Sequence, residues 1–192
     1  MIDLLLGTIA STIAIDQSDK DLISRLFREK KYGKGEYFLA EGEVCRQVGF
    51  IISGVMQYYI NHDGEEKTYG FGKEMDFVCN NESFIPQKPS RQAIQALEDC
   101  TLFVISYNDL QLFYAEIRNG ERFGRLVIEQ VFVQTLRGLN SFYTDSPEIR
   151  YEKFIKEYPE LVQRIPQYYI ASYVGVKPQS LSRIRKRTIQ RD

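Results

Sequence analysis

The segment YYIASYVGVKPQSLSRIRKR, residues 168–187, decides the fold of the C-terminal part of this 192-residue chain. Small and apolar residues recur in it at helical spacing on both sides of a short break: Ile170, Ala171, Val174, Leu181 and Ile184. Within the break, Gly175 can adopt the left-handed conformation that ends a helix, and Pro178 suits the first position of a new one. The segment therefore predicts two helices that pack closely around a tight turn, which is a helix-turn-helix.

The second of these helices would carry polar side chains on the face opposite Leu181 and Ile184. Gln179, Ser180 and Arg183 are able to reach base edges, since arginine pairs with guanine and glutamine with adenine in the major groove. The cations further along suit backbone phosphates. The residues predicted to bind DNA are Lys177, Gln179, Ser180, Ser182, Arg183, Arg185, Lys186 and Arg187. The alternative is a helical hairpin that packs without binding DNA.

Charge is distributed unevenly along the chain. Residues 164–192 contain seven basic residues and one acidic residue, a net charge of +6. Residues 1–163 contain 18 basic and 25 acidic residues, a net charge of −7. A basic end on an acidic body favours contact between that end and a polyanion. The alternative is that the basic end is simply solvated surface.

Residues 32–78 have a different character, with recurrent glycines between short runs of strand-forming residues. Asp63-Gly64 separates two such runs and predicts a β-hairpin. Strands are expected over 36–40, 48–54, 55–61, 66–71 and 100–106, with an irregular stretch over 77–97. Many short strands joined by glycine turns are typical of a β-sandwich or barrel.

Helical patterns flank this region. Residues 17–31 have apolar residues at helical spacing and Ser18 as a suitable N-cap, which predicts a helix. The apolar run at the start of the chain is interpreted as a helix and not as a signal peptide, because no basic leader precedes it. Further helices are predicted over 107–117, 121–143 and 147–165, the last limited or kinked by Pro159.

The helix over 121–143 is apolar on more than one face, so it must bury most of its surface. Packing against its own β-domain and against a second copy of the chain would achieve this. The alternative is burial within the core of a single chain.

Metal and catalytic chemistry find little support in the composition. Cys45, Cys79 and Cys100 lie far apart, and the only histidine is His62, so neither a zinc site nor a cysteine-held iron–sulfur cluster is expected. Free, mostly buried thiols in a reducing compartment are expected instead. With no nucleophile motif and no paired carboxylates on one face, no catalytic residue is assigned and the chain is predicted not to be an enzyme.

No stretch approaches the length of apolar residues that a membrane-spanning helix requires. Together with the interpretation of the N-terminal segment as a helix, this leads to the expectation of a cytoplasmic protein without membrane partners.

At this point the sequence resembles regulators of the Crp/Fnr family, the relatives of the catabolite activator protein, over nearly its whole length. Residues 30–71, from KKYGKGEYF to EKTYGF, are similar to the family's cyclic-nucleotide-binding-type β-roll. Helix 121–143 resembles the family's dimerisation helix, and IASYVGVKPQSLSRIRKR, residues 170–187, its recognition unit. The resemblance implies an α+β fold with an N-terminal double-stranded β-helix or jelly roll, a long dimerisation helix and a C-terminal helix-turn-helix domain.

The implied domains are an effector-sensing β-roll with flanking helices over 1–120, the dimerisation helix over 121–144 and a DNA-binding domain over 145–192. Many family members follow the recognition helix with a β-wing. This chain ends at Asp192, so the wing is expected to be absent or shortened. Fewer phosphate contacts would follow.

The family's cyclic-nucleotide binders carry a phosphate-binding cassette, Gly-Glu followed about ten residues later by Arg, then Ser or Thr, then Ala. The corresponding stretch here is NNESFIPQKPSRQAI, in which no glycine precedes Glu82 and Gln92 replaces the hydroxyl residue. The ligand-binding candidates are Glu82, Ser83, Ser90 and Arg91. The expected effector is a cyclic nucleotide or another small molecule, or there is none. The alternative role for Arg91 is a surface or interdomain ion pair.

The resulting hypothesis is a dimeric, sequence-specific DNA-binding transcription regulator that is controlled by a small-molecule effector in the β-roll. Its partners would be a second copy of the chain and a near-palindromic DNA site with half-sites about 34 Å apart. The alternative is a cyclic-nucleotide-binding-like ligand or interaction module without specific DNA binding.

Overall fold

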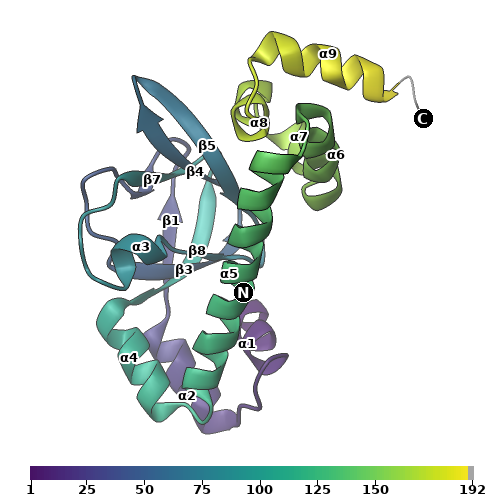
Figure 1. Ribbon diagram of the computed structural model, residues 1–192. Coiled ribbons are helices and arrows are strands. Elements are labelled where there is room, and N and C mark those ends of the chain that lie inside the picture. Colours follow the sequence, from purple (N-terminus) through teal and green to yellow (C-terminus); the bar gives the residue numbers. More distant parts are fainter. Residues whose placement is uncertain (190–192) are drawn as a thin grey trace. The chain divides into compact units, whose positions relative to one another are not determined.

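The computed structural model describes residues 1–189, with side chains through Arg187, and it divides into two compact units (Figure 1). The first unit comprises Met1–Tyr59 and Phe71–Glu129, and the second comprises Ile60–Gly70 and the chain from Gln130 onward. Arg191 and Asp192, which the charge count includes, lie outside the described residues.

The β-structure consists of two four-stranded sheets, as a sandwich or jelly roll requires. One has the strand order β1-β8-β3-β6 and the other β2-β7-β4-β5. The strands are β1 (Arg28–Tyr32), β2 (Tyr37–Leu39), β3 (Gln47–Ser53), β4 (Met56–His62), β5 (Glu65–Gly72), β6 (Phe77–Val78), β7 (Gln92–Ala96) and β8 (Cys100–Ser106). Every expected strand is present, and β6 and β7 are added within the stretch expected to be irregular.

The predicted hairpin between β4 and β5 is confirmed. Asp63 and Gly64 at its tip both have positive φ, 53° and 76°. Positive φ at both central residues is the geometry of the turn that matches the twist of a two-residue hairpin, and Asp-Gly is a preferred sequence for it.

The helices are α1 (Ile2–Ala10), α2 (Gln17–Leu26), α3 (Asn81–Phe84), α4 (Tyr107–Glu116), α5 (Gly120–Thr144), α6 (Pro147–Glu157), α7 (Leu161–Arg164), α8 (Gln167–Val174) and α9 (Pro178–Ile189). Pro159 separates α6 from α7, as its effect on a helix predicts.

The helix expected over 17–31 is shorter than predicted. It ends at Leu26, and Arg28–Tyr32 forms β1, which pairs antiparallel with β8. The predicted N-cap, Ser18, is also wrong. Asp16 is the cap, and it exchanges hydrogen bonds with Asp19 in a capping box. Long-range pairing with β8 therefore overrides a local sequence that is compatible with a helix.

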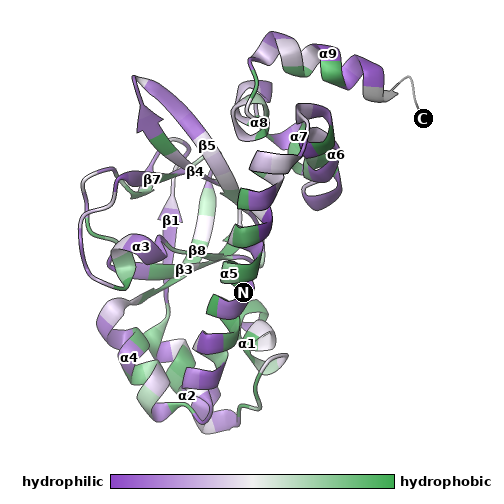
Figure 2. Ribbon diagram, viewed as in Figure 1, coloured by the Kyte–Doolittle hydropathy of each residue, from purple (hydrophilic) through white to green (hydrophobic). Residues whose placement is uncertain are grey.

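The first unit has two apolar clusters. One lies inside the roll and includes Phe38, Ile51, Met56 and Leu102 from strands of both sheets. In the other, side chains of α1, α2, α4 and the start of α5 pack on β3 and β8. Figure 2 shows hydrophobic residues on these elements in green. The layers of helix and sheet thus bury the outer face of the first sheet as well as the interior of the roll.

The second unit has its own core, formed by the helices after α5. Its buried side chains include Tyr151, Phe154, Leu161, Ile165, Ile170, Ala171, Val174, Leu181 and Ile184. The rings of Phe154 and Tyr173, 5.5 Å apart between centroids, join α6 to α8. Among the described residues of the two units, no helix is both long enough and apolar enough to cross a membrane.

Candidate functional site

The turn between α8 and α9 has the geometry that the opening segment predicts. Gly175 adopts the left-handed conformation, with φ 80° and ψ 35°. Its N–H donates to the carbonyl of Ser172 at 3.0 Å, and the N–H of Val176 donates to the carbonyl of Ala171 at 2.9 Å. These two bonds form a Schellman motif, which satisfies the last carbonyls of α8 and redirects the chain.

The predicted inner face of this helix pair is also confirmed. The facing residues are buried: Ile170, Ala171, Val174, Leu181 and Ile184. Removal of this apolar surface from water is the main stabilisation that holds two such short helices together.

The polar residues of α9 lie at the surface. Six of the eight predicted DNA-binding residues are exposed: Lys177, Gln179, Ser182, Arg183, Lys186 and Arg187. Ser180 and Arg185 are half-buried. Within the described residues, Arg187 lies 3.8 Å from the carboxylate of Glu148, whereas Arg183 and Lys186 make no ion pair. Most of the charge on this face is therefore available to a partner.

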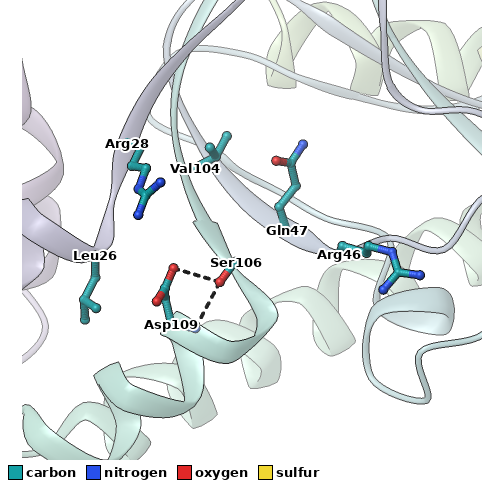
Figure 3. A pocket seen from close by; sticks show the side chains of 7 residues that line it. All are labelled: Leu26, Arg28, Arg46, Gln47, Val104, Ser106 and Asp109. Atoms are coloured by element: carbon teal, nitrogen blue, oxygen red, sulfur yellow. Dashed lines mark hydrogen bonds between the residues drawn. The ribbon is translucent and has the colours of Figure 1, made fainter.

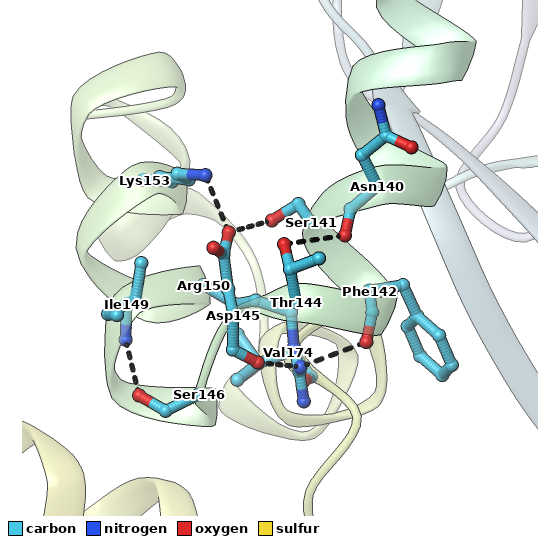
Figure 4. A network of polar contacts seen from close by, with 10 residues as sticks. All are labelled: Asn140, Ser141, Phe142, Thr144, Asp145, Ser146, Ile149, Arg150, Lys153 and Val174. Atoms are coloured by element: carbon cyan, nitrogen blue, oxygen red, sulfur yellow. Dashed lines mark hydrogen bonds and ion pairs between the residues drawn. The ribbon is translucent and has the colours of Figure 1, made fainter.

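A polar network joins the end of α5 to the helix pair (Figure 4). The guanidinium of Arg150 donates to the carbonyls of Val174 at 2.8 Å, Asp145 at 2.7 Å and Phe142 at 3.4 Å. One side chain of α6 thus links the end of α8, the end of α5 and the connection after α5. Sequence reasoning missed this residue because its partners are backbone carbonyls, which leave no residue pattern.

The carboxylate of Asp145 completes this network. It accepts hydrogen bonds from Lys153 and from the Ser141 hydroxyl, both at 2.5 Å, and these bonds lower the pKa of the Asp145 side chain. The carboxylate therefore remains ionised and keeps α5 connected to α6 well into the acidic range.

The β4–β5 hairpin contacts α8 inside the second unit. The hydroxyl of Ser172 donates to the carbonyl of Glu66 at 3.0 Å and accepts from the N–H of Thr68 at 2.9 Å. The pKa of Glu65 is lowered chiefly by its hydrogen bond with Lys67 and in smaller part by the positive charge of Lys177. The charges of Glu65 and Lys177 therefore attract each other. Strand β5 of the hairpin is thus tied to α8, the helix that precedes the predicted recognition helix.

Helix α5 exposes a long apolar surface. Its large exposed apolar side chains are Ile128, Phe132, Val133, Leu136, Leu139, Phe142 and Tyr143. Of the helix's residues only Gly120 and Phe123 are buried. The sequence left open the alternative that α5 is buried within the core of a single chain. In the described residues α5 is mostly exposed, so this alternative does not hold.

The four ligand-binding candidates lie around α3 and the loop that follows it, but two of their hydroxyls hold the loop together. Ser83 is buried, and its hydroxyl accepts from the N–H of Cys45 at 2.9 Å and donates to the carbonyl of Lys88 at 2.5 Å. The hydroxyl of Ser90, also buried, exchanges two 2.9 Å bonds with the backbone of Gln92.

The side chain of Gln92 occupies the polar centre of this stretch. Its amide nitrogen donates to Glu82 at 3.1 Å, and its amide oxygen accepts from Asn80 at 2.5 Å. Arg91 is exposed and, within the described residues, makes no ion pair. Gln92, which replaces the hydroxyl residue of the family cassette, thus donates to the carboxylate of Glu82, one of the predicted ligand-binding residues.

A separate pocket of about 410 Å³ lies where α2, β1, β3 and α4 meet (Figure 3). Arg28 and Arg46 line it with Asp109, whose carboxylate accepts a 2.8 Å hydrogen bond from the Ser106 hydroxyl. None of the predicted ligand-binding residues lines this pocket. The cassette predicted from the sequence and this pocket therefore lie in different parts of the first unit.

Two of the three cysteines are neighbours in space although 34 residues separate them. The sulfurs of Cys45 and Cys79 lie 4.0 Å apart, and Cys45 is buried while Cys79 is partly exposed. Cys100 is buried. All three are free thiols, as expected, and the described residues contain no cluster of three or more potential metal ligands.

Comparison with known proteins gives a direct match for part of the chain. Residues 29–116 match the cyclic nucleotide-binding domain family. The match begins in β1 and ends with α4, so it includes both sheets and the cassette. Among curated proteins, the sequence has no significant match.

Solved structures extend the similarity to most of the chain. The c-di-GMP-responsive global regulator CLP of Xanthomonas campestris has a TM-score of 0.65 and 16% identity, with 91% of this chain and 92% of that chain covered. A putative Crp/Fnr transcriptional regulator of Eubacterium rectale has a TM-score of 0.68 and 17% identity, with 92% of this chain and 85% of that chain covered. The catabolite activator protein of Thermus thermophilus has a TM-score of 0.57 and 14% identity, with 96% of this chain and 87% of that chain covered.

Two of these three solved structures are described as regulators and the third as an activator protein. At such identities they establish the fold and leave individual residue roles open. Residues 29–116 are therefore similar to the cyclic nucleotide-binding domain family, and the chain shares its fold with these three solved structures.

Proposed function

We propose that the protein is a dimeric, sequence-specific DNA-binding transcription regulator controlled by a small-molecule effector in its β-roll. The observation that carries this proposal is the helix pair α8–α9. Its apolar residues are buried against each other, while Gln179, Arg183 and Lys186 are exposed on the recognition helix. A recognition helix needs this separation, because one face must hold the fold and the other must reach the major groove.

Base reading is assigned to Gln179, Ser180 and Arg183, near the start of α9. Residues early in a recognition helix are those that contact base edges. Lys177, Ser182, Arg185, Lys186 and Arg187 would contact the phosphate backbone, which fixes orientation without reading sequence. Arg187 would have to leave Glu148 or share its charge with it.

The dimer is assigned to α5. Ile128, Phe132, Leu136, Leu139 and Tyr143 follow one another at intervals of three or four residues and are all exposed. This spacing places them on one stripe of the helix, which is the pattern of a seam between two helices. Pairing two copies through α5 would cover this stripe and present two recognition helices to one near-palindromic site.

The effector is assigned to the cyclic nucleotide-binding domain, with a phosphate-bearing small molecule as the ligand class. Exposed Arg91 would attract the phosphate. Glu82 is bonded by Gln92, so a ligand that uses Glu82 must displace that side-chain amide. Because CLP, which shares the fold, responds to c-di-GMP, both mononucleotide and dinucleotide cyclic ligands belong in the test.

The decisive experiment selects duplexes bound by the purified protein from a pool with a randomised central region. The expected result is enrichment of a near-palindromic motif with half-sites one helical turn apart. Binding that enriches no motif and disappears near physiological salt would reject specific recognition and favour a ligand or interaction module.

The effector is tested by thermal unfolding with cyclic AMP, cyclic GMP and cyclic di-GMP at millimolar concentration. A ligand at about 100 times its dissociation constant adds roughly 2.7 kcal/mol to the free energy of unfolding, enough for a shift of several degrees. The shift should be lost in Arg91→Ala and kept in Arg118→Ala, which removes another exposed arginine. No shift with any of the three would reject cyclic nucleotides as effectors.

A further inference from the structure

The proximity of Cys45 and Cys79 is independent of both proposed binding functions. Cys45 lies just before β3, and Cys79 follows β6 directly, between that strand and Asn80, which caps α3. Their sulfurs are 4.0 Å apart. A disulfide has a sulfur–sulfur distance of about 2.05 Å, so the two atoms need to approach by only about 2 Å to bond.

The two thiols differ in acidity. The hydrogen bond with Cys79, with smaller contributions from hydrogen bonds with the backbone of Asn80 and Gln47, lowers the pKa of Cys45 to about 7 despite the opposing effect of burial. The same shared hydrogen bond, with burial, raises the pKa of Cys79 well above its usual value. Near neutral pH the pair therefore holds a substantial fraction of thiolate on Cys45, stabilised by a neighbouring thiol.

We propose that Cys45 and Cys79 form an oxidant-sensitive modification site, which peroxide converts into an intramolecular disulfide. The Cys45 thiolate attacks one peroxide oxygen and breaks the O–O bond, which gives a sulfenic acid, and the departing hydroxide takes up a proton as water. The Cys79 sulfur then attacks the Cys45 sulfur, and the sulfenic hydroxyl leaves with the proton of the Cys79 thiol as a second water. Two thiols are oxidised and one hydrogen peroxide is reduced, so the step balances.

The environment of Cys79 bears on both access and partner. Cys79 is the more exposed of the two residues, so we expect a molecule as small as hydrogen peroxide to approach the pair from its side. A nearby resolving cysteine is the feature that diverts a sulfenic acid into a reversible disulfide and away from irreversible oxidation.

Cys100 provides an internal control. Burial and the nearby charge of Glu98 raise its pKa to about 11, and its sulfur bonds only carbonyls, those of Glu98 at 3.2 Å and Val55 at 3.6 Å. Only a small fraction of Cys100 is in the thiolate form near neutral pH. Among the described hydrogen bonds, its sulfur also has no thiol partner. The pair should react with peroxide at least about tenfold faster than Cys100.

The pair is connected to the effector cassette by hydrogen bonds. The N–H of Cys45 donates to Ser83 in α3, and the carbonyl of Cys45 accepts from Gln87 at 3.1 Å. Cys79 is the neighbour of Asn80, which holds Gln92. Formation of the disulfide would therefore displace both the start of α3, which follows Cys79, and the Cys45 backbone that Ser83 holds by a hydrogen bond.

The test treats the purified protein with increasing equivalents of hydrogen peroxide and maps cysteine-containing peptides by mass spectrometry without reduction. The expected product is one Cys45–Cys79 crosslink within a single chain, two hydrogens lighter than the reduced form and reversed by dithiothreitol. Cys100→Ser should give the same crosslink at the same rate.

Cys79→Ala and Cys45→Ala should each abolish the crosslink, and their thermal unfolding shows whether they remain folded. Oxidation of all three wild-type thiols at one rate would overturn the proposal. So would sulfinic or sulfonic acid at Cys45 or Cys79 without a crosslink, or a crosslink between chains. None of these readouts uses DNA or a nucleotide, so the result is independent of the proposed function.

Discussion

The cassette around α3 and the helix pair α8–α9 both gather polar side chains, but the hydrogen bonds of these side chains end in different places. In the cassette, Ser83 and Ser90 bond the backbone, and Gln92 bonds Glu82. On α9, Gln179, Ser182 and Lys186 are exposed. Polar residues with internal partners stabilise a fold, whereas exposed ones of matching chemistry are free to recognise a partner. The destination of the bonds separates the two roles better than residue type does.

The proposed function pairs two copies of the chain through α5, and the largest effect is expected on this dimerisation. Leu136→Glu should raise the dimer dissociation constant about a thousandfold, because the charge enters the seam twice and each copy loses about 2 kcal/mol of apolar burial. Analytical ultracentrifugation measures the constant. Gln134→Glu, on the opposite side of α5, is the matched control and should leave it unchanged. Equal effects of the two variants would remove α5 as the interface.

The structural role of the cassette serines is tested by stability. Ser83→Ala leaves the N–H of Cys45 and the carbonyl of Lys88 without their partner, and we expect a loss of about 2 to 3 kcal/mol in the free energy of unfolding. Urea unfolding measures it. Glu82→Gln is exposed, keeps an acceptor for Gln92 and should stay within about 0.5 kcal/mol of the parent. If Ser83→Ala is equally harmless, the serine is not a structural residue and returns to the list of ligand contacts.

The reading role of α9 is tested by specificity. Arg183→Ala should cost about 1 to 3 kcal/mol of discrimination at one base pair per half-site and relax the selected motif there. Competition between the selected duplex and single-base variants measures this. An unchanged preference would show that Arg183 does not contact a base edge.

The smallest effect is expected for a phosphate contact. Lys186→Ala should weaken binding to all sequences alike and reduce the slope of log affinity against log salt by about one per bound site. Fluorescence anisotropy at several salt concentrations measures the slope. A change confined to the selected sequence would instead make Lys186 a base-reading residue.

Local chemistry allowed much of this fold to be predicted from sequence. Asp63-Gly64 predicted the hairpin, and Gly175 with Pro178 predicted the turn between two helices, because each depends on backbone preferences of residues adjacent in the chain. Residues 28–31 were misassigned to a helix because their strand conformation depends on pairing with β8. The four exposed residues of β1 are all charged, which leaves only Tyr32 as an inward-facing signal.

The candidate sites divide in the same way. The exposed polar face of α9 was predictable because its residues lie on one helix with a regular period. The bond between Gln92 and Glu82, the contacts of Arg150 and the meeting of Cys45 with Cys79 join residues that local patterns do not connect. Such contacts depend on how the loops close, which a single sequence does not specify.

The contact of Ser172 with the hairpin sets a limit on signalling through it. One hydroxyl makes both hydrogen bonds, so a movement of the hairpin away from α8 breaks the two together. Two neutral bonds contribute about 1 to 3 kcal/mol net, which corresponds to a change in equilibrium of roughly 5- to 150-fold. Thermodynamic reciprocity applies the same factor in both directions. An effector that released this contact could alter DNA affinity by no more than that factor through it, and DNA would alter effector affinity equally.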